Sequence, residues 1–61
     1  MPSELFNLEC TVLDKLGRKK KTYHVGVYNR IEAVENAKQT IINSVSETVT
    51  FEVFVIEHFF P

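Results

Sequence analysis

The spacing of apolar residues changes twice along this chain, and that change limits the fold more than any other feature. Between residues 5 and 13 the apolar residues fall on even positions, and between residues 21 and 29 they fall on odd positions. Such alternation is typical of strands that bury one face. From about residue 48 to residue 57, β-branched and aromatic residues follow one another almost without interruption, which favours a third strand.

The segment between the second and third strands has helical spacing instead. In residues 29–46 the apolar residues recur every three or four positions, at Ile31, Val34, Ala37, Ile41 and Val45. This pattern predicts one amphipathic helix.

The two ends of this helix also carry signals. Asn29 and Glu32 have the spacing of a capping box, in which each side chain accepts from the other residue's backbone amide. Ser44, Ser46 and Thr48 are poor helix formers. We therefore expect the helix to begin after Asn29 and to end near residue 46.

The first two strands are joined by the segment DKLGRKK, whose glycine indicates a hairpin turn. A two-residue turn at Gly17 and Arg18 would pair Val12 with Tyr23 and would set Asp14 opposite Lys21. A register shifted by two residues keeps the same apolar match, so the pattern predicts a hairpin and leaves its exact pairs open.

These elements predict an α+β fold with the order ββαβ, in one domain of residues 1–61. A right-handed crossover through the helix makes the second and third strands parallel, with the first strand between them. The sheet is then antiparallel with strand order 2-1-3, and one helix covers one face. The core expected on that face consists of Phe6, Leu8, Cys10, Val12, Tyr23, Val25, Val27, Ile31, Val34, Ile41, Val45, Val49, Phe51, Val53 and Val55.

The other face of the sheet has no cover in this arrangement. It carries polar residues and Tyr28 from the hairpin but Phe54, Ile56 and Phe60 from the last strand, and this strand is also a free sheet edge. We expect these three residues to form an interface with a protein partner, a homodimer first of all. In the alternative, the chain bends at His58 and places its last phenylalanines under the helix.

The size of the chain also favours a partner. A domain of 61 residues buries only about 60% of the surface of its unfolded chain, so small domains usually need a disulfide, a metal or oligomerisation. Cys10 is the only cysteine, and no Cys/His cluster has zinc spacing, so we expect no disulfide, metal or cofactor. No apolar run could span a membrane and no signal peptide precedes the domain, so we expect a cytoplasmic protein without membrane contact.

The charges are unevenly placed. Five of the seven basic residues lie at the predicted hairpin tip, and the rest of the chain carries two basic against eight acidic residues, a formal charge of −6. The tip could contact phosphates or an acidic partner, or it could be a solvated turn. Five cations allow only weak nucleic-acid contact without sequence preference. The basic residues at the tip are Lys15, Arg18, Lys19, Lys20 and Lys21.

Nothing in the sequence predicts catalysis. Alternation places Cys10 on the core face but His24 and His58 on the other, so no Cys/His pair is expected. Glu32 and Glu35 fall on the solvent side of the helix, and no glycine-rich phosphate loop is present. We expect a protein that is not an enzyme and has no small-molecule substrate.

The strand-strand-helix-strand order in about 60 residues resembles that of small bacteriophage proteins that bind and inhibit host RNA polymerase. The resemblance covers most of the chain in element order. It does not extend to a shared motif, and the chain lacks the tryptophans expected in that family. It implies a small regulatory binding protein, and it assigns no role to Lys19, Lys20 or Lys21.

Two functions remain from the sequence. The first is a non-enzymatic protein-interaction or regulatory module, homodimeric through its last strand. The alternative is a nucleic-acid-binding accessory protein that contacts phosphates through the basic tip.

Overall fold

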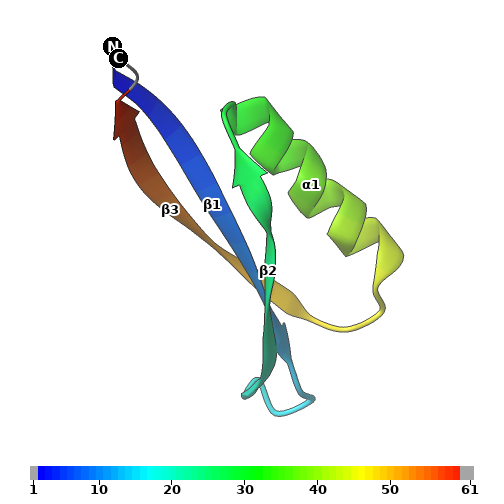
Figure 1. Ribbon diagram of the computed structural model, residues 1–61. Helices are drawn as coiled ribbons and strands as arrows, with labels where there is room; N and C mark the ends of the chain where they lie inside the picture. Colours follow the sequence, from blue (N-terminus) through cyan, green and yellow to red (C-terminus); the bar gives the residue numbers. More distant parts are fainter. Residues whose placement is uncertain (1, 60–61) are drawn as a thin grey trace.

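The computed structural model describes the backbone of residues 2–59 and the side chains of residues 4–57. The elements follow in the order β1 (Pro2–Leu13), β2 (Lys19–Tyr28), α1 (Ile31–Ser44) and β3 (Val49–Phe59) (Figure 1). β1 is the central strand and pairs antiparallel with both neighbours, in the sheet order β2-β1-β3. The predicted ββαβ fold and strand order are confirmed.

The hairpin turn is longer than the expected two-residue turn. The Asp14 N–H donates to the Arg18 carbonyl oxygen and the Gly17 N–H donates to the Asp14 carbonyl oxygen, at 2.9 and 3.0 Å. Gly17 has φ +79°, in the left-handed region. This is a three-residue loop with its glycine in the last position, a common hairpin turn. Asp14 therefore lies opposite Arg18, and its expected pairing with Lys21 is wrong.

Two extra residues in β2 shift the register along the hairpin. Near the turn Cys10 pairs with Tyr23, two residues away from the pairing with Val25 that a two-residue turn would give. Farther on, His24 pairs with Glu9 and Gly26 pairs with Leu8, so Val25 is a bulged residue with no partner of its own. A second bulge lies at Lys20.

The bulge at Val25 reverses the two faces for the rest of β2. Val27 pairs with Asn7 and Tyr28 pairs with Phe6. Directly paired residues share a face, so Tyr28 moves to the helix side and Val27 moves to the opposite side. The prediction that Val27 belongs to the core is therefore wrong, as is the placement of Tyr28 on the other face.

The helix begins one residue later than expected and without a capping box. Arg30 is the N-cap residue, and no side chain caps the helix there. Glu32 lies in the first turn, where a carboxylate interacts favourably with the helix dipole. At the other end, the Ser44 hydroxyl donates to the Thr40 carbonyl oxygen at 2.6 Å, and Val45 is already extended. The serine back-bond is typical of a weakening helix end.

The helix packs mainly on β2 and β1 and does not reach the end of β3. Only Asn29 and Arg30 separate the end of β2 from α1, so the helix turns back along β2, and most of its contacts are with β2 and β1 (Figure 1). The buried core is correspondingly small. It consists of Leu8, Cys10, Val12 and Val34.

The core predicted from the sequence is too large. Several of its members keep more than a third of their surface exposed, because α1 is a single helix beside a long, narrow sheet and reaches only part of it. Leu8 and Val34 are the largest side chains that are fully buried. The expected core residues that are exposed instead are Tyr23, Val27, Ile31, Val45 and Val55.

Candidate interaction surface and basic hairpin

The face of the sheet opposite α1 is open, and its residues follow from the strand pairing. We call it the open face. Asn7 on the central strand lies between Val27 of β2 and Phe54 of β3, and Leu5 lies beside Ile56. These residues form an apolar area around one amide side chain.

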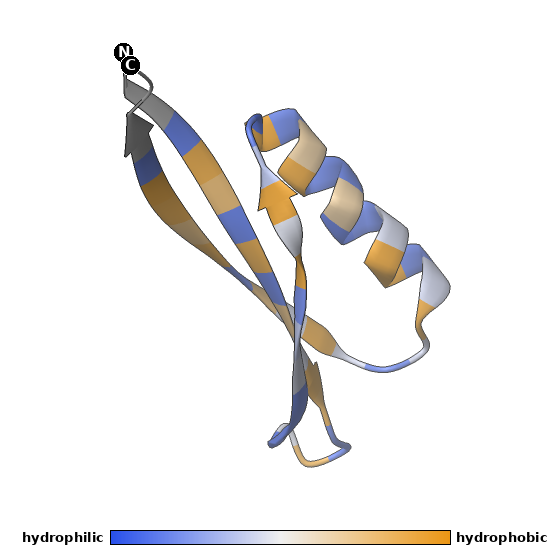
Figure 2. Ribbon diagram, viewed as in Figure 1, coloured by the Kyte–Doolittle hydropathy of each residue, from blue (hydrophilic) through white to orange (hydrophobic). Residues whose placement is uncertain are grey.

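The largest exposed apolar side chains of this area come from β2 and β3. Val27, Phe54 and Ile56 are 50%, 48% and 42% exposed. On the helix face, Val55 is 59% exposed, since α1 does not reach this part of β3. We call Phe54, Val55 and Ile56 the β3 apolar surface. Figure 2 shows a hydrophobic stretch in the part of β3 that lies away from the helix.

The strand that carries this surface does not bend back toward the helix. The β3 backbone stays paired with β1 through Ser3 and His58 and through Pro2 and Phe59. The alternative of a bend at His58 is therefore wrong. Phe60, the third residue expected at the interface, lies outside the described residues.

Asn7 adds a polar group to the open face that lacks a partner. Its Oδ1 atom is buried and accepts no hydrogen bond from any side chain or backbone group that the structure describes. A buried acceptor without a donor destabilises a protein by about 1–3 kcal/mol.

Polar rows bound the apolar area toward the hairpin turn. Glu9 lies between His24 and Glu52, and Thr11 lies between Thr22 and Thr50. The Thr11 and Thr22 hydroxyl groups are hydrogen-bonded at 3.1 Å. The open face is thus apolar in one half and polar in the other.

The five basic residues of the hairpin are all exposed, as expected. Three of them interact with a neighbouring side chain, two with a carboxylate and one with an aromatic ring. Arg18 Nε lies 3.2 Å from Asp14 Oδ2, and Lys20 Nζ lies 3.4 Å from Glu47 Oε2. Lys21 Nζ lies 4.9 Å from the centre of the Tyr23 ring, a cation–π distance. Among the described side chains, Lys15 and Lys19 form no ion pair.

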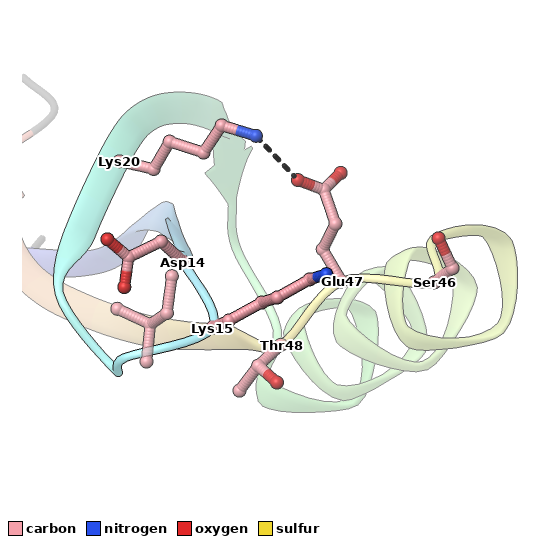
Figure 3. Close-up of a pocket in the computed structure, with 7 residues that line it drawn as sticks. Asp14, Lys15, Lys20, Ser46, Glu47 and Thr48 are labelled. Atoms are coloured by element: carbon pink, nitrogen blue, oxygen red, sulfur yellow. Dashed lines mark hydrogen bonds and ion pairs between the residues drawn. The ribbon is translucent and has the colours of Figure 1, made fainter.

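A shallow cleft of about 390 Å³ lies between this hairpin and the connection from α1 to β3. Figure 3 shows the Lys20–Glu47 ion pair that joins its two sides. The carboxylate of Asp14 also lines the cleft, and its Oδ1 accepts from the backbone amides of Leu16 and Arg18. The bond from the Arg18 amide is the main reason that the pKa of Asp14 lies below its usual value. The cleft thus holds two carboxylates, which makes it a poor site for a phosphate.

Cys10 and His24 line one pocket on the sheet, but no hydrogen bond joins the two described side chains. Cys10 is buried on the helix face, and His24 pairs with Glu9. Burial raises the pKa of the Cys10 thiol above its ordinary value, which disfavours the reactive thiolate. The side chain of His58 lies outside the described side chains. Residues 2–59 hold no group of three or more metal-ligating side chains.

No helix among residues 2–59 has the length and apolar character needed to span a bilayer. Comparisons with protein-family models, with curated proteins and with solved structures gave no match. The function of this chain is therefore inferred from its surface alone.

Two exposed apolar residues were not predicted from the sequence, Val27 on the open face and Val55 in the β3 apolar surface. The signal for Val27 was Gly26, because a glycine inside a strand often marks a bulge. Asn7 was also missed, and its signal was a polar residue flanked by apolar ones on the central strand. No sequence signal places Val55 beyond the reach of the helix.

Proposed function

We propose that this chain is a small, non-enzymatic protein-interaction module with a regulatory role. It acts by binding another polypeptide through the β3 apolar surface. The observation that carries the proposal is the exposure of Phe54 and Ile56, at 48% and 42%, in the part of β3 that the only helix of residues 2–59 does not reach.

Little of the apolar surface of this chain is buried within the domain. Fully burying one large apolar side chain is worth about 1.5–3 kcal/mol, so covering the exposed half of three is worth about 2–4 kcal/mol. Domains are stable by only about 5–15 kcal/mol in total. With a core of four apolar side chains, this domain has much to gain from a partner.

The composition of the area supports a protein partner in particular. Exposed aromatic and aliphatic groups surrounded by polar residues are typical of protein interfaces. Phe54 lies beside Asn7, whose Oδ1 acceptor needs a donor. Glu9, Glu52 and His24 form the polar border.

Phe54→Glu tests this proposal. The charge should lower the mass measured by light scattering or abolish capture of a protein partner by the tagged full-length chain. Leu16→Glu is the matched control, since Leu16 is exposed on the hairpin loop, far along the sheet from Phe54. The proposal is refuted if the protein is monomeric both before and after the change and captures the same partners in both forms.

The basic hairpin supports a second candidate function, weak contact with nucleic-acid phosphates. Lys15 and Lys19 are exposed and form no ion pair with any described side chain. Their contribution to affinity would fall steeply with salt, and two to five phosphate contacts give a slope of about 2–4 in log affinity against log salt. The carboxylates of Asp14 and Glu47 oppose this function.

A set of charge variants tests this second candidate. Replacing Lys15 and Lys19 by Gln should abolish binding to a labelled single-stranded or duplex oligonucleotide at low salt, as should replacing Lys19, Lys20 and Lys21. Glu47→Gln should strengthen binding, because it releases Lys20 from its ion pair. Absence of binding by the unmodified chain at low salt would discard this function.

A further inference from the structure

We propose that the polypeptide bound by β3 is a second copy of this chain. The two β3 strands pair antiparallel along their free edges, about a two-fold axis at Val55. Two three-stranded sheets then join into one sheet of six strands. This inference rests on the proposed function and names its partner and its geometry.

The first argument concerns the backbone groups at the free edge of β3. The Leu13 N–H donates to the Thr48 carbonyl oxygen at 2.9 Å, beside the pairing of Val12 with Val49. Hydrogen-bonded and non-hydrogen-bonded pairs alternate in an antiparallel ladder. Even-numbered residues of β3 therefore bond to β1, and odd-numbered residues, Val55 among them, direct N–H and C=O outward.

Residues 49–57 protect this edge only with the two exposed carboxylates of Glu52 and Glu57. Proteins usually protect an edge strand with charged side chains, a proline, a bulge or a short length. β3 has eleven residues, its pairing with β1 runs without a register shift, and residues 49–57 contain no proline. A long, regular edge is a template for another strand.

The second argument concerns the two faces of β3. Phe54 and Ile56 are exposed on the open face, and Val55 is exposed on the helix face. A partner packed on either face would leave the other face wet. A strand paired along the edge places side chains beside both faces, so edge pairing accounts for the whole β3 apolar surface.

The third argument is that the sequence of β3 complements itself. A two-fold axis perpendicular to the sheet sets residues of equal parity opposite one another. With the axis at Val55, Phe54 lies opposite the partner's Ile56, twice by symmetry, and Glu57 lies opposite the partner's Val53.

Other axes fit less well. An axis at Glu52 or at Glu57 sets two carboxylates directly opposite each other, which is unfavourable. An axis at Phe54 sets both carboxylates of the strand opposite apolar residues, Glu52 opposite the partner's Ile56 and Glu57 opposite the partner's Phe51, whereas the axis at Val55 does so only for Glu57. Among the axes on residues 52–57, only the one at Val55 pairs Phe54 with an isoleucine.

The first test compares two variants by light scattering. The unmodified chain should have twice the 7.1 kDa mass of one chain. Val55→Pro removes an N–H that faces outward, which a single edge strand tolerates, so the fold should persist by circular dichroism while the mass falls to one chain. Val27→Lys places a charge on the open face, away from the edge, and should leave the dimer intact.

Two results would overturn the inference. One is an unmodified chain that is monomeric at all concentrations. The other is a dimer that Val27→Lys dissociates and Val55→Pro does not, since this result would place the interface on the open face.

A cysteine crosslink reports on the register even if Val55→Pro does not fold. In a Cys10→Ala background, Val55→Cys brings two Cα atoms about 5.5 Å apart, within the range of a disulfide. Thr50→Cys is the control, because this axis sets the two Thr50 positions about 33 Å apart. Oxidation should crosslink Val55→Cys at least ten times faster than Thr50→Cys, and equal rates would contradict the register.

The same measurements separate this inference from the proposed function. If the chain is monomeric but captures a different protein, and Phe54→Glu abolishes that capture, the inference fails and the proposed function stands. If replacing Phe54 changes neither the mass of the protein in solution nor its capture of a protein partner, both the inference and the proposed function fail.

Discussion

The ring of Tyr28 lies directly over Gly26, so that a Cβ atom added to the glycine would meet the phenol oxygen at 3.0 Å and two ring carbons at 3.2 and 3.3 Å. The two residues lie on the same face of β2, two positions apart, just after the bulge at Val25. An aromatic ring over a strand glycine shields backbone that would otherwise be exposed. The missing side chain at Gly26 thus leaves room for the Tyr28 ring on the helix side of the sheet.

We predict that Gly26→Val destabilises the domain by about 1–3 kcal/mol, the usual range for overpacking. Gly26→Ala should destabilise the domain less than Gly26→Val. Adding Tyr28→Phe to Gly26→Val should restore part of the lost stability, because the atom closest to the added Cβ is the phenol oxygen. Urea denaturation of the two single variants and the double variant measures this coupling. Strictly additive effects would show that the ring does not restrict this position.

Gly17 is required for a different reason, the backbone angle of the hairpin loop. Its φ of +79° lies in the left-handed region, and no atom lies within 4 Å of an added Cβ. Gly17→Ala should therefore lower the free energy of unfolding by about 1–2 kcal/mol through backbone strain alone. Gly17→Asn should lower it less, because asparagine tolerates this region. Equal losses in a denaturation experiment would contradict this explanation.

The fold could be predicted from the sequence because its signals are local and repeated. The change of apolar spacing between residues 28 and 31 separates strand from helix, and the handedness of the crossover then determines the strand order. None of these steps depends on one particular residue pair. The predicted topology was therefore correct although the predicted hairpin turn was wrong.

The faces of the sheet could be predicted only in part. Tyr23, Val25 and Val27 alternate as if β2 were regular, so the bulge is hidden in a pattern that still looks continuous. A single extra residue reverses every later side chain. Gly26 was the only local signal of that reversal.

The extent of the exposed surface could not be predicted, since it depends on where the helix lies across the sheet. The apolar spacing of α1 indicates which side of the helix is buried but not which strands it covers. The short connection at Asn29 and Arg30 keeps α1 near β2. Val55 is exposed for that reason, although its position in the alternation marks it as a core residue.

Asp14 should make the stability of the hairpin depend on acidic pH. Its pKa is lowered, first by the hydrogen bond from the Arg18 amide and also by those from the Leu16 amide and the Arg18 side chain. In the unfolded chain the pKa of an aspartate is about 3.9. The stability due to ionised Asp14 is therefore fully present above about pH 4 and is lost as the pH falls through the lower pKa of the folded state.

Asp14→Asn is the corresponding test. The variant should be less stable than the unmodified chain at pH 7, and the difference should shrink as the pH falls below about 4. Thermal unfolding at several pH values measures the difference, and a carboxyl titration by NMR measures the pKa itself. A difference that stays constant from pH 7 to pH 2 would show that the Asp14 charge does not stabilise the hairpin.

Cys10 should react slowly with thiol reagents in the folded chain. Its side chain is 3% exposed in the core, and burial raises the pKa of its thiol. The raised pKa means that folding favours the neutral thiol. The stability that the neutral Cys10 thiol contributes is fully present below its unfolded-state pKa of about 8.5. It falls as the pH rises toward the pKa of the folded state.

We predict that a thiol reagent such as iodoacetamide modifies Cys10 at least tenfold more slowly in the folded chain than in urea at pH 8. Leu8→Ala provides the comparison, because Leu8 is fully buried on the same strand and its truncation should destabilise the core by about 2–5 kcal/mol. That variant should expose Cys10 by unfolding and restore fast modification. Fast labelling of the folded, unmodified chain would place the thiol at the surface and would contradict the packing of α1 on β1.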